Sequence, residues 1–154
     1  MAIYLKLGSI AGSVTVQGFE SWIALDSFKW SFNANVAQGH GGANVTANEV
    51  VVTMRMEKAS TAIVNAGVNR TVLKPKVQIQ FTTTGKNTMD QFLGYELEGC
   101  LISKYSVDGA KDDPPTETLT LNFTKIIETY TSRDAKLTGA KSTVTYDVTQ
   151  GSAT

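Results

Sequence analysis

The chain has 154 residues, of which 42% are hydrophobic and 18% are charged, so it has the composition of a folded domain and not of a disordered segment. Fourteen basic residues balance fourteen acidic ones. This balance argues against nucleic-acid binding, because that role needs a positive excess that pairs with phosphates. No apolar run reaches the length of a bilayer-spanning helix, so membrane insertion is not expected.

The first residues alternate between apolar and polar, and they contain a single cation, Lys6, without a continuous apolar segment. This pattern predicts a strand and not a signal peptide. We therefore expect the protein to be made in the cytoplasm and not to use the general export route. Cys100 is the only cysteine, so an intrachain disulfide is impossible and stability must come from packing or from assembly.

Alternation typical of strands runs through most of the chain. It covers residues 3–7, 14–16 and 23–32, and within the last range its parity changes across Asp26 and Ser27, as a β-bulge or sharp bend requires. Further strands are predicted over residues 50–56, 77–81, 95–107, 119–127 and 144–148. The stretch "VDGAKDDPP", residues 107–115, predicts a polar, turn-rich loop.

One segment, "KASTAIVNAGVN", departs from alternation. It offers Ser60 or Thr61 as an N-cap, apolar residues at helical spacing, and Gly67 as a stop, which predicts one short helix of two or three turns. No repeat or linker divides the chain, so residues 1–154 are expected to form a single domain with the last few residues frayed. The expected fold class is a mainly β barrel or sandwich with one short α-helix.

The only histidine, His40, lies in a glycine-rich stretch, "NANVAQGHGGANVTANE", at residues 33–49. A metal site needs at least two good ligands held together, and the neighbours of His40 are Gly, Ala, Gln and Asn. A phosphate-binding P-loop needs a Gly-Lys-Ser/Thr sequence, and this stretch has no lysine. We therefore interpret it as a long exposed loop with neither metal nor cofactor.

The other candidate catalytic residues also lack partners. Glu96 and Glu98 share one strand face, which is typical of a solvated face, or of a face toward an aqueous channel, rather than of a glycosidase pair. Cys100, expected on a strand, has no adjacent base and is interpreted as a packing residue. The aspartates of residues 108–113 do not follow the EF-hand pattern. The chain is therefore not expected to be an enzyme.

Four stretches, in this order, resemble the haemolysin-coregulated protein (Hcp) family, whose members form the tube of bacterial type VI secretion systems. "IYLKLGSIAGSV" resembles the family's first strand and turn, and "ESWIALDSFKWSF" its long second element. "MRMEKASTAIVNAGVN" is similar to the strand that leads into the family's helix. The most specific stretch is "LISKYSVDGAKDDPPTETLTLNFTKIIETY". The resemblance runs from about Ile3 to Val148. One departure is Phe19, in a turn where many members carry a histidine.

The resemblance implies a β-barrel of two sheets with one short helix, of which six copies close into a ring. Rings would stack into a hollow tube inside a contractile sheath, tipped by a spike, and effector proteins would travel in the lumen. The implied partners are thus further copies of this chain, sheath and spike proteins, and effectors. The implied route is secretion by this machine, without a signal peptide, to the extracellular space or a target cell. No fused toxin domain is expected.

The same resemblance implies roles for individual residues. Residues 33–49 would reach toward a neighbouring protomer or ring, and the candidate contacts are Gln38, Gly39, His40, Gly41, Gly42 and Asn44. Three polar residues are candidates for lining the lumen and contacting cargo. Ser31 is expected to point away from the apolar Trp30 and Phe32, and the other two, Thr61 and Asn65, lie on the predicted helix.

Two other interpretations stay open from the sequence. A tube protein of a contractile phage tail, or of a phage-like injection particle, would share the same ring-forming β-barrel. A monomeric ligand-binding β-barrel would need an apolar interior cavity, whereas the apolar residues here are sufficient only to fill a barrel.

Overall fold

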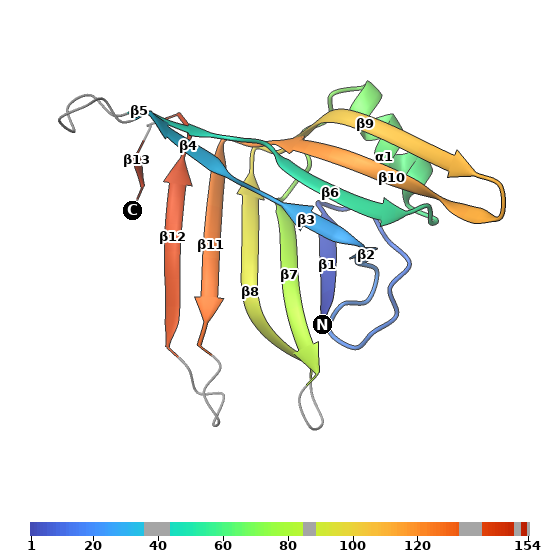
Figure 1. Cartoon of the computed structure of the whole chain (residues 1–154), viewed down its shortest axis with the longest axis horizontal. Coiled ribbons are helices and arrows are strands. Elements are labelled where there is room, and N and C mark those ends of the chain that lie inside the picture. Colours follow the sequence, from blue (N-terminus) through green and yellow to red (C-terminus); the bar gives the residue numbers. More distant parts are fainter. Residues whose placement is uncertain (36–43, 85–88, 133–139, 150–151, 154) are drawn as a thin grey trace.

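The computed structural model describes residues 1–35, 44–84, 89–132, 140–149 and 152–153. Within these ranges the protein is built from antiparallel strands and one short helix (Figure 1). The strands form a seven-stranded sheet, a four-stranded sheet and a two-stranded hairpin. The mainly β class with one helix is therefore confirmed. None of the described helical residues form a segment long and apolar enough to cross a membrane.

The large sheet contains both ends of the described chain. Its strands, in spatial order, are β13 (Ser152–Ala153), β12 (Lys141–Asp147), β11 (Lys125–Thr131), β8 (Met89–Glu98), β7 (Val77–Thr84), β1 (Ala2–Leu7) and β2 (Ile23–Leu25). Its register places Leu5 opposite Ile79, and Ile79 opposite Tyr95, so the apolar residues of three strands share one face. Leu5 and Ile79 are fully buried there.

The small sheet packs its apolar face against this core. Its strands, in spatial order, are β3 (Ser27–Lys29), β6 (Val50–Arg55), β10 (Asp113–Asn122) and β9 (Leu101–Ala110). Val52 of β6 is opposite Leu119 of β10, and both are fully buried. The hairpin of β4 (Phe32–Asn35) and β5 (Asn44–Ala47) continues from this layer toward β12 (Figure 1). There the Tyr146 hydroxyl donates to the backbone oxygen of Val45 at 3.2 Å.

The chain changes sheets where the sequence pattern changes. The parity switch at Asp26 and Ser27 separates β2, in the large sheet, from β3, in the small one, and the Asp26 N–H donates to the Thr53 carbonyl across the corner. Gly99 makes a second corner between β8 and β9 with a φ of 59°, a left-handed conformation that favours glycine. Cys100 follows it and is buried between the strands, not within one.

The helix α1 (Ser60–Val68) lies where the sequence predicts it, but its expected N-cap is wrong. The N-cap is Ala59, whose side chain cannot accept a hydrogen bond. The Ser60 hydroxyl, in the first helical position, instead accepts from the Glu57 N–H at 3.0 Å and donates to the buried Glu117 at 2.5 Å. A tertiary contact has therefore replaced the expected local cap.

The expected stop at Gly67 is also wrong, because the helix continues through Val68 and its C-cap is Asn69. The Asn69 side chain donates to the carbonyl oxygen of Asn65 at 2.9 Å, and Arg70 then turns the chain with a φ of 52°. Gly67 faces β9 next to Ile102.

Further local predictions from the sequence fail. The strands expected over residues 95–107 and 119–127 are each divided, at residues 99–100 and 123–124, where the chain passes from one sheet to the other. Residues 14–16 form no regular strand, although Val14 exchanges backbone hydrogen bonds with Ser21 and Trp22 in an irregular hairpin. The polar stretch at residues 107–115 is a long β9–β10 hairpin and not a loop. Its turn uses Asp112 with a φ of 74°, and a register shift between Asp113 and Thr116 accommodates the two prolines.

Candidate functional site

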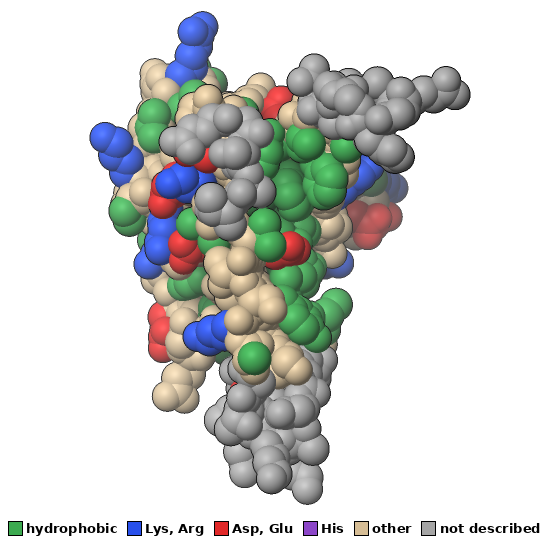
Figure 2. Space-filling view, turned by 90° about the vertical axis from the view of Figure 1, so that its left-hand side faces the viewer, with side chains coloured by type: hydrophobic (Ala, Val, Ile, Leu, Met, Phe, Trp, Pro, Cys, Tyr) green, Lys and Arg blue, Asp and Glu red, His purple; other side chains and the backbone are tan. Residues whose placement is uncertain are grey.

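Large hydrophobic side chains are exposed where β12 meets the β4–β5 hairpin. Phe32 is 58% exposed, Val45 43%, Tyr130 47% and Val144 51%, and we call these four residues the strand patch. Figure 2 shows hydrophobic side chains gathered on this side of the molecule. An apolar cluster of this kind is typical of a surface that another protein covers.

Strand register explains why these side chains gather. Tyr130 is opposite Ser142, so it lies diagonally beside Val144 on the same face of the large sheet. Phe32 and Val45 are diagonal neighbours in the β4–β5 hairpin in the same way. This face of β11 and β12 continues the core face, since Ile126 on it is buried. The apolar face of the large sheet therefore extends beyond the part that the small sheet covers.

A second apolar surface lies on α1. Val64 and Val68 are four residues apart, so they share one helix face, and they are 37% and 76% exposed. Between this face and β9 lies a groove with a volume of about 220 Å³. We call it the helix groove, and its lining residues are Val64, Gly67, Val68, Ile102, Ser103, Lys104 and Tyr105. In Figure 1, α1 and β9, which line the helix groove, lie toward one end of the long axis, and β12 and the β4–β5 hairpin, which carry most of the strand patch, lie toward the other.

The glycine-rich loop contacts expected from the sequence lie mostly outside the described residues. Gln38, Gly39, His40, Gly41 and Gly42 belong to residues 36–43, which the structure does not describe. Asn44 is described, and as the first residue of β5 it pairs with Asn35, the last residue of β4. The loop expected over residues 33–49 is therefore wrong at both ends, because residues 33–35 and 44–47 are strands of a hairpin whose base carries half of the strand patch.

The expected lumen residues lie on two separate elements. Ser31, exposed between β3 and β4, accepts a hydrogen bond from the Asn48 side chain at 2.8 Å. Thr61 and Asn65 are both exposed on α1, and Asn65 accepts from the Asn69 side chain. The structure thus brings Thr61 and Asn65 to one helix face and places Ser31 in another region (Figure 1).

Next to Ser31, Trp30 is half-buried whereas Phe32 is largely exposed. Phe32 therefore does not share the half-buried surroundings of Trp30, although both residues alternate with Ser31. The core does not reach as far as β4, and Phe32 joins the strand patch instead.

A buried polar cluster joins α1 to the small sheet, and sequence analysis did not single it out. The Glu117 side chain is fully buried and accepts hydrogen bonds from Ser60 at 2.5 Å and from Tyr105 at 2.6 Å. Burial and the bond to Glu117 raise the pKa of Tyr105 to about 12. The signal was present in the sequence, since Glu117 shares the alternation of the buried Leu119 and Leu121. The cluster holds the helix in place.

The candidate catalytic residues from the sequence, Cys100, Glu96 and Glu98, are buried or ion-paired. Burial raises the pKa of Cys100 to about 12, so its thiol stays protonated at neutral pH. Glu96 accepts from Lys76 at 2.9 Å, and Glu98 lies 3.6 Å from Lys125. Among the described residues, no group of three or more His, Cys, Asp or Glu side chains could hold a metal ion.

Comparison with solved structures identifies the class of protein that this fold defines. A chain described as a type six secretion system protein is 20% identical, with a TM-score of 0.89 over 99% of both chains. Hcp1 from Salmonella typhimurium is 19% identical, with a TM-score of 0.80 over 99% of this chain and 98% of that one. A type VI secretion system effector from Yersinia pestis is 18% identical, with a TM-score of 0.75 over 95% and 99%. The fold is that of Hcp proteins.

The sequence itself gives the same answer. It matches the family described as "Type VI secretion system effector, Hcp" over residues 4–130, which is most of the chain. No curated protein matches it. The chain therefore belongs to the Hcp family of type VI secretion proteins.

Proposed function

We propose that this chain is the structural subunit of a type VI secretion inner tube, in which six copies close into a ring and rings stack into a hollow tube. The observation that carries the proposal is the pair of unlike apolar surfaces, the strand patch and the helix groove, toward opposite ends of one Hcp-like protomer. The implied partners are further copies, sheath and spike proteins, and effector proteins in the lumen.

Unlike surfaces at two ends favour a head-to-tail contact. When the strand patch of one copy covers the helix groove of the next, each protomer uses both surfaces, and repetition by rotation closes a ring. A two-fold dimer would bury one kind of surface twice and leave the other exposed. Balanced charge also supports assembly, since a large net charge of one sign would oppose it.

The test uses two variants that each lose one surface. Val144→Asp introduces a charge into the strand patch, and Val68→Asp introduces one into the helix groove. Each variant alone is expected to be monomeric by light scattering. An equimolar mixture is expected to form dimers of one copy of each, because the intact groove of the first meets the intact patch of the second. Val72→Asp, on an exposed valine outside both surfaces, is the control and should assemble normally.

A mixture that stays monomeric while the control assembles would contradict the head-to-tail contact. Dimers formed by either variant alone would also contradict it, because they would require a two-fold contact.

Passage through the lumen is the second part of the proposal. Ser31, Thr61 and Asn65 are polar and exposed, as residues that contact a passing effector must be. Ser31→Gln enlarges a small exposed side chain without adding charge. It is expected to reduce the stabilisation of co-expressed effectors while ring formation stays normal. Unchanged stability of every effector would remove Ser31 from the cargo surface.

We propose secretion by the type VI machine itself. The protein would be made in the cytoplasm, assembled within the sheath, and delivered to the extracellular space or a target cell. Loss of the protein from culture medium when the host's sheath gene is deleted is the expected result, with the intracellular level unchanged. Continued release without the sheath would contradict this route.

A further inference from the structure

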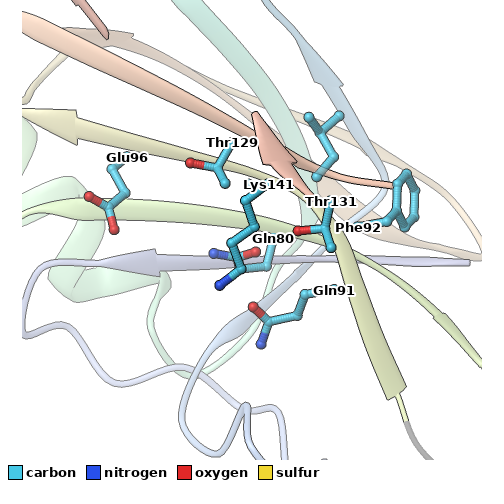
Figure 3. Close-up of a pocket in the computed structure, with 9 residues that line it drawn as sticks. Gln80, Gln91, Phe92, Glu96, Thr129, Thr131 and Lys141 are labelled. Atoms are coloured by element: carbon cyan, nitrogen blue, oxygen red, sulfur yellow. The ribbon is translucent and has the colours of Figure 1, made fainter. Parts of the chain in front are cut away.

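A polar hollow with a volume of about 300 Å³ lies over Gly94 in the large sheet, apart from both apolar surfaces (Figure 3). Gly94 of β8 is directly opposite Gln80 of β7 on one side and Thr129 of β11 on the other. Gly94 has no side chain, and the Gln80 amide lies over it, 2.8 Å from the point where a Cβ would stand. The hollow is also lined by Gln91, Phe92, Leu93, Glu96, Thr131 and Lys141.

Among the described residues, the hollow contains a positive charge that no carboxylate neutralises. Its only acidic lining residue, Glu96, already accepts from Lys76 at 2.9 Å and from Gln78 at 3.5 Å. Within the part of the chain that the structure describes, Lys141 has no carboxylate at ion-pair distance. The hollow therefore presents a cation to an incoming ligand, while its carboxylate is already paired.

Hydrogen-bond donors from four strands converge beside this cation. Figure 3 shows the side chains of Gln80, Gln91, Thr131 and Lys141 directed into the same region. They come from β7, β8, β11 and β12, so the sheet itself fixes their spacing. One ammonium group can pair with a single negative charge, and the neutral amides and the hydroxyl can donate to the same group. Donation to a charged acceptor gives stronger hydrogen bonds than donation to a neutral one.

We propose that this hollow binds the carboxylate of an acidic polypeptide segment, with Lys141 pairing to the carboxylate. Gln80 and Gln91 can both donate and accept, so they can bond to the peptide groups on either side of an acidic side chain. The hollow is too small to enclose a large ligand and suits one side chain. This site does not depend on ring formation, because each of its residues belongs to one protomer.

The test is an NMR titration of ¹⁵N-labelled protein with short blocked peptides. The probe is Ac-Gly-Glu-Gly-NH₂, and its neutral counterpart is Ac-Gly-Gln-Gly-NH₂. The acidic peptide is expected to shift the amide signals of Gly94, Thr129 and Thr131, and to bind up to about fivefold more tightly than the neutral one, as an exposed ion pair allows. Sodium acetate is the third probe and reports binding of a carboxylate without a peptide.

Two variants test whether peptide binding depends on the side chains of the hollow. Lys141→Gln is expected to reduce binding of the acidic peptide to that of the neutral one, and Thr131→Val, which keeps the shape of the side chain, should weaken it severalfold. Lys29→Gln, on an exposed lysine of the small sheet, is the matched control and should bind normally. Unchanged spectra without peptide show that a variant is folded.

Three results would overturn the proposal. The first is equal binding of the acidic and neutral peptides, and the second is undiminished binding by Lys141→Gln. The third is acetate binding as tight as that of the acidic peptide, which would make the hollow a general anion site and not a peptide site. Each result can be obtained whether or not the protein forms rings.

Discussion

At the scale of single residues, the least expected feature is a fully buried glutamate that pairs with no cation among the described residues. Glu117 accepts hydrogen bonds from the hydroxyl groups of Ser60 and Tyr105, which come from α1 and β9. A buried carboxyl group without hydrogen-bond donors destabilises the folded state by several kcal/mol. Each hydroxyl therefore contributes to stability, because its removal would leave a carboxyl oxygen buried without a donor. The cluster is therefore a point of attachment for the helix whose outer face forms the helix groove.

Ser60→Ala tests this attachment. The substitution removes one donor to Glu117 and the acceptor of the Glu57 N–H, and we expect it to lower the free energy of unfolding by about 1–3 kcal/mol. Urea denaturation measures the change. Thr61→Ala, on the adjacent exposed residue, is the control and should change stability by less than about 0.5 kcal/mol. Equal effects of the two substitutions would show that the buried bond contributes nothing.

Cys100 gives a prediction about pH. Burial raises its pKa to about 12, against 9.0 for a free thiol, so the folded state binds one more proton than the unfolded state between these values. Stability is therefore expected to fall as pH rises from about 9 toward 12. At pH 8 the thiol should resist iodoacetamide until urea unfolds the protein. Cys100→Ser should leave no thiol for iodoacetamide to alkylate, even in urea, and should flatten the fall in stability between pH 9 and 12. Rapid alkylation of the folded protein would contradict the account.

At the scale of elements, the corners between sheets depend on particular residues. Gly99 has a φ of 59°, and an added Cβ would lie 2.5 Å from the Thr124 hydroxyl oxygen. Gly99→Ala is therefore expected to cost at least about 1–2 kcal/mol in thermal or urea unfolding. Gly109→Ala is the matched control, since its Cβ would meet no atom within 4 Å, and it should be nearly neutral. A neutral result at Gly99 would mean that the corner rearranges without cost.

The strands could be predicted because alternation records which face is buried. The buried Val50, Val52 and Met54 follow the predicted face, and the parity change at Asp26 correctly marks a change of sheet. The β9–β10 hairpin could not be predicted in this way, because its distal half is exposed on both faces and carries no periodicity. Its polar residues and prolines indicate a loop. The backbone nevertheless pairs as two antiparallel strands, and the positive φ of Asp112 makes the turn between them.

At the scale of the whole molecule, sequence alone could not locate the candidate assembly surfaces. Val144 and Val64 have the periodicity of core residues, and their exposure follows only from where the second sheet ends and where the helix docks. Glu117 was missed for the converse reason, because a carboxylate in an apolar row suggests an exposed edge. The family could be identified from the order of four sequence stretches along the chain. This order reflects the succession of strands and helix, and it does not depend on which sheet face is buried.

We expect the segment between β4 and β5 to act in assembly. Deletion of residues 38–43 shortens the connection between Asn35 and Asn44 and removes no residue of the described core. We expect rings to form with normal mass while stacking into tubes is lost, and the unfolding temperature should change little. Sedimentation separates rings from stacked tubes. Tubes of normal length from the deletion variant would contradict a role for this segment in stacking.

Negative-stain electron microscopy of the purified protein shows directly whether the chain closes into six-membered rings. Light scattering on the same sample supplies the mass. We expect six-fold rings with an open centre and a mass close to six times 16.6 kDa. Val144→Asp should abolish these rings. A monodisperse monomer at high concentration, with the folded spectrum intact, would contradict the claim.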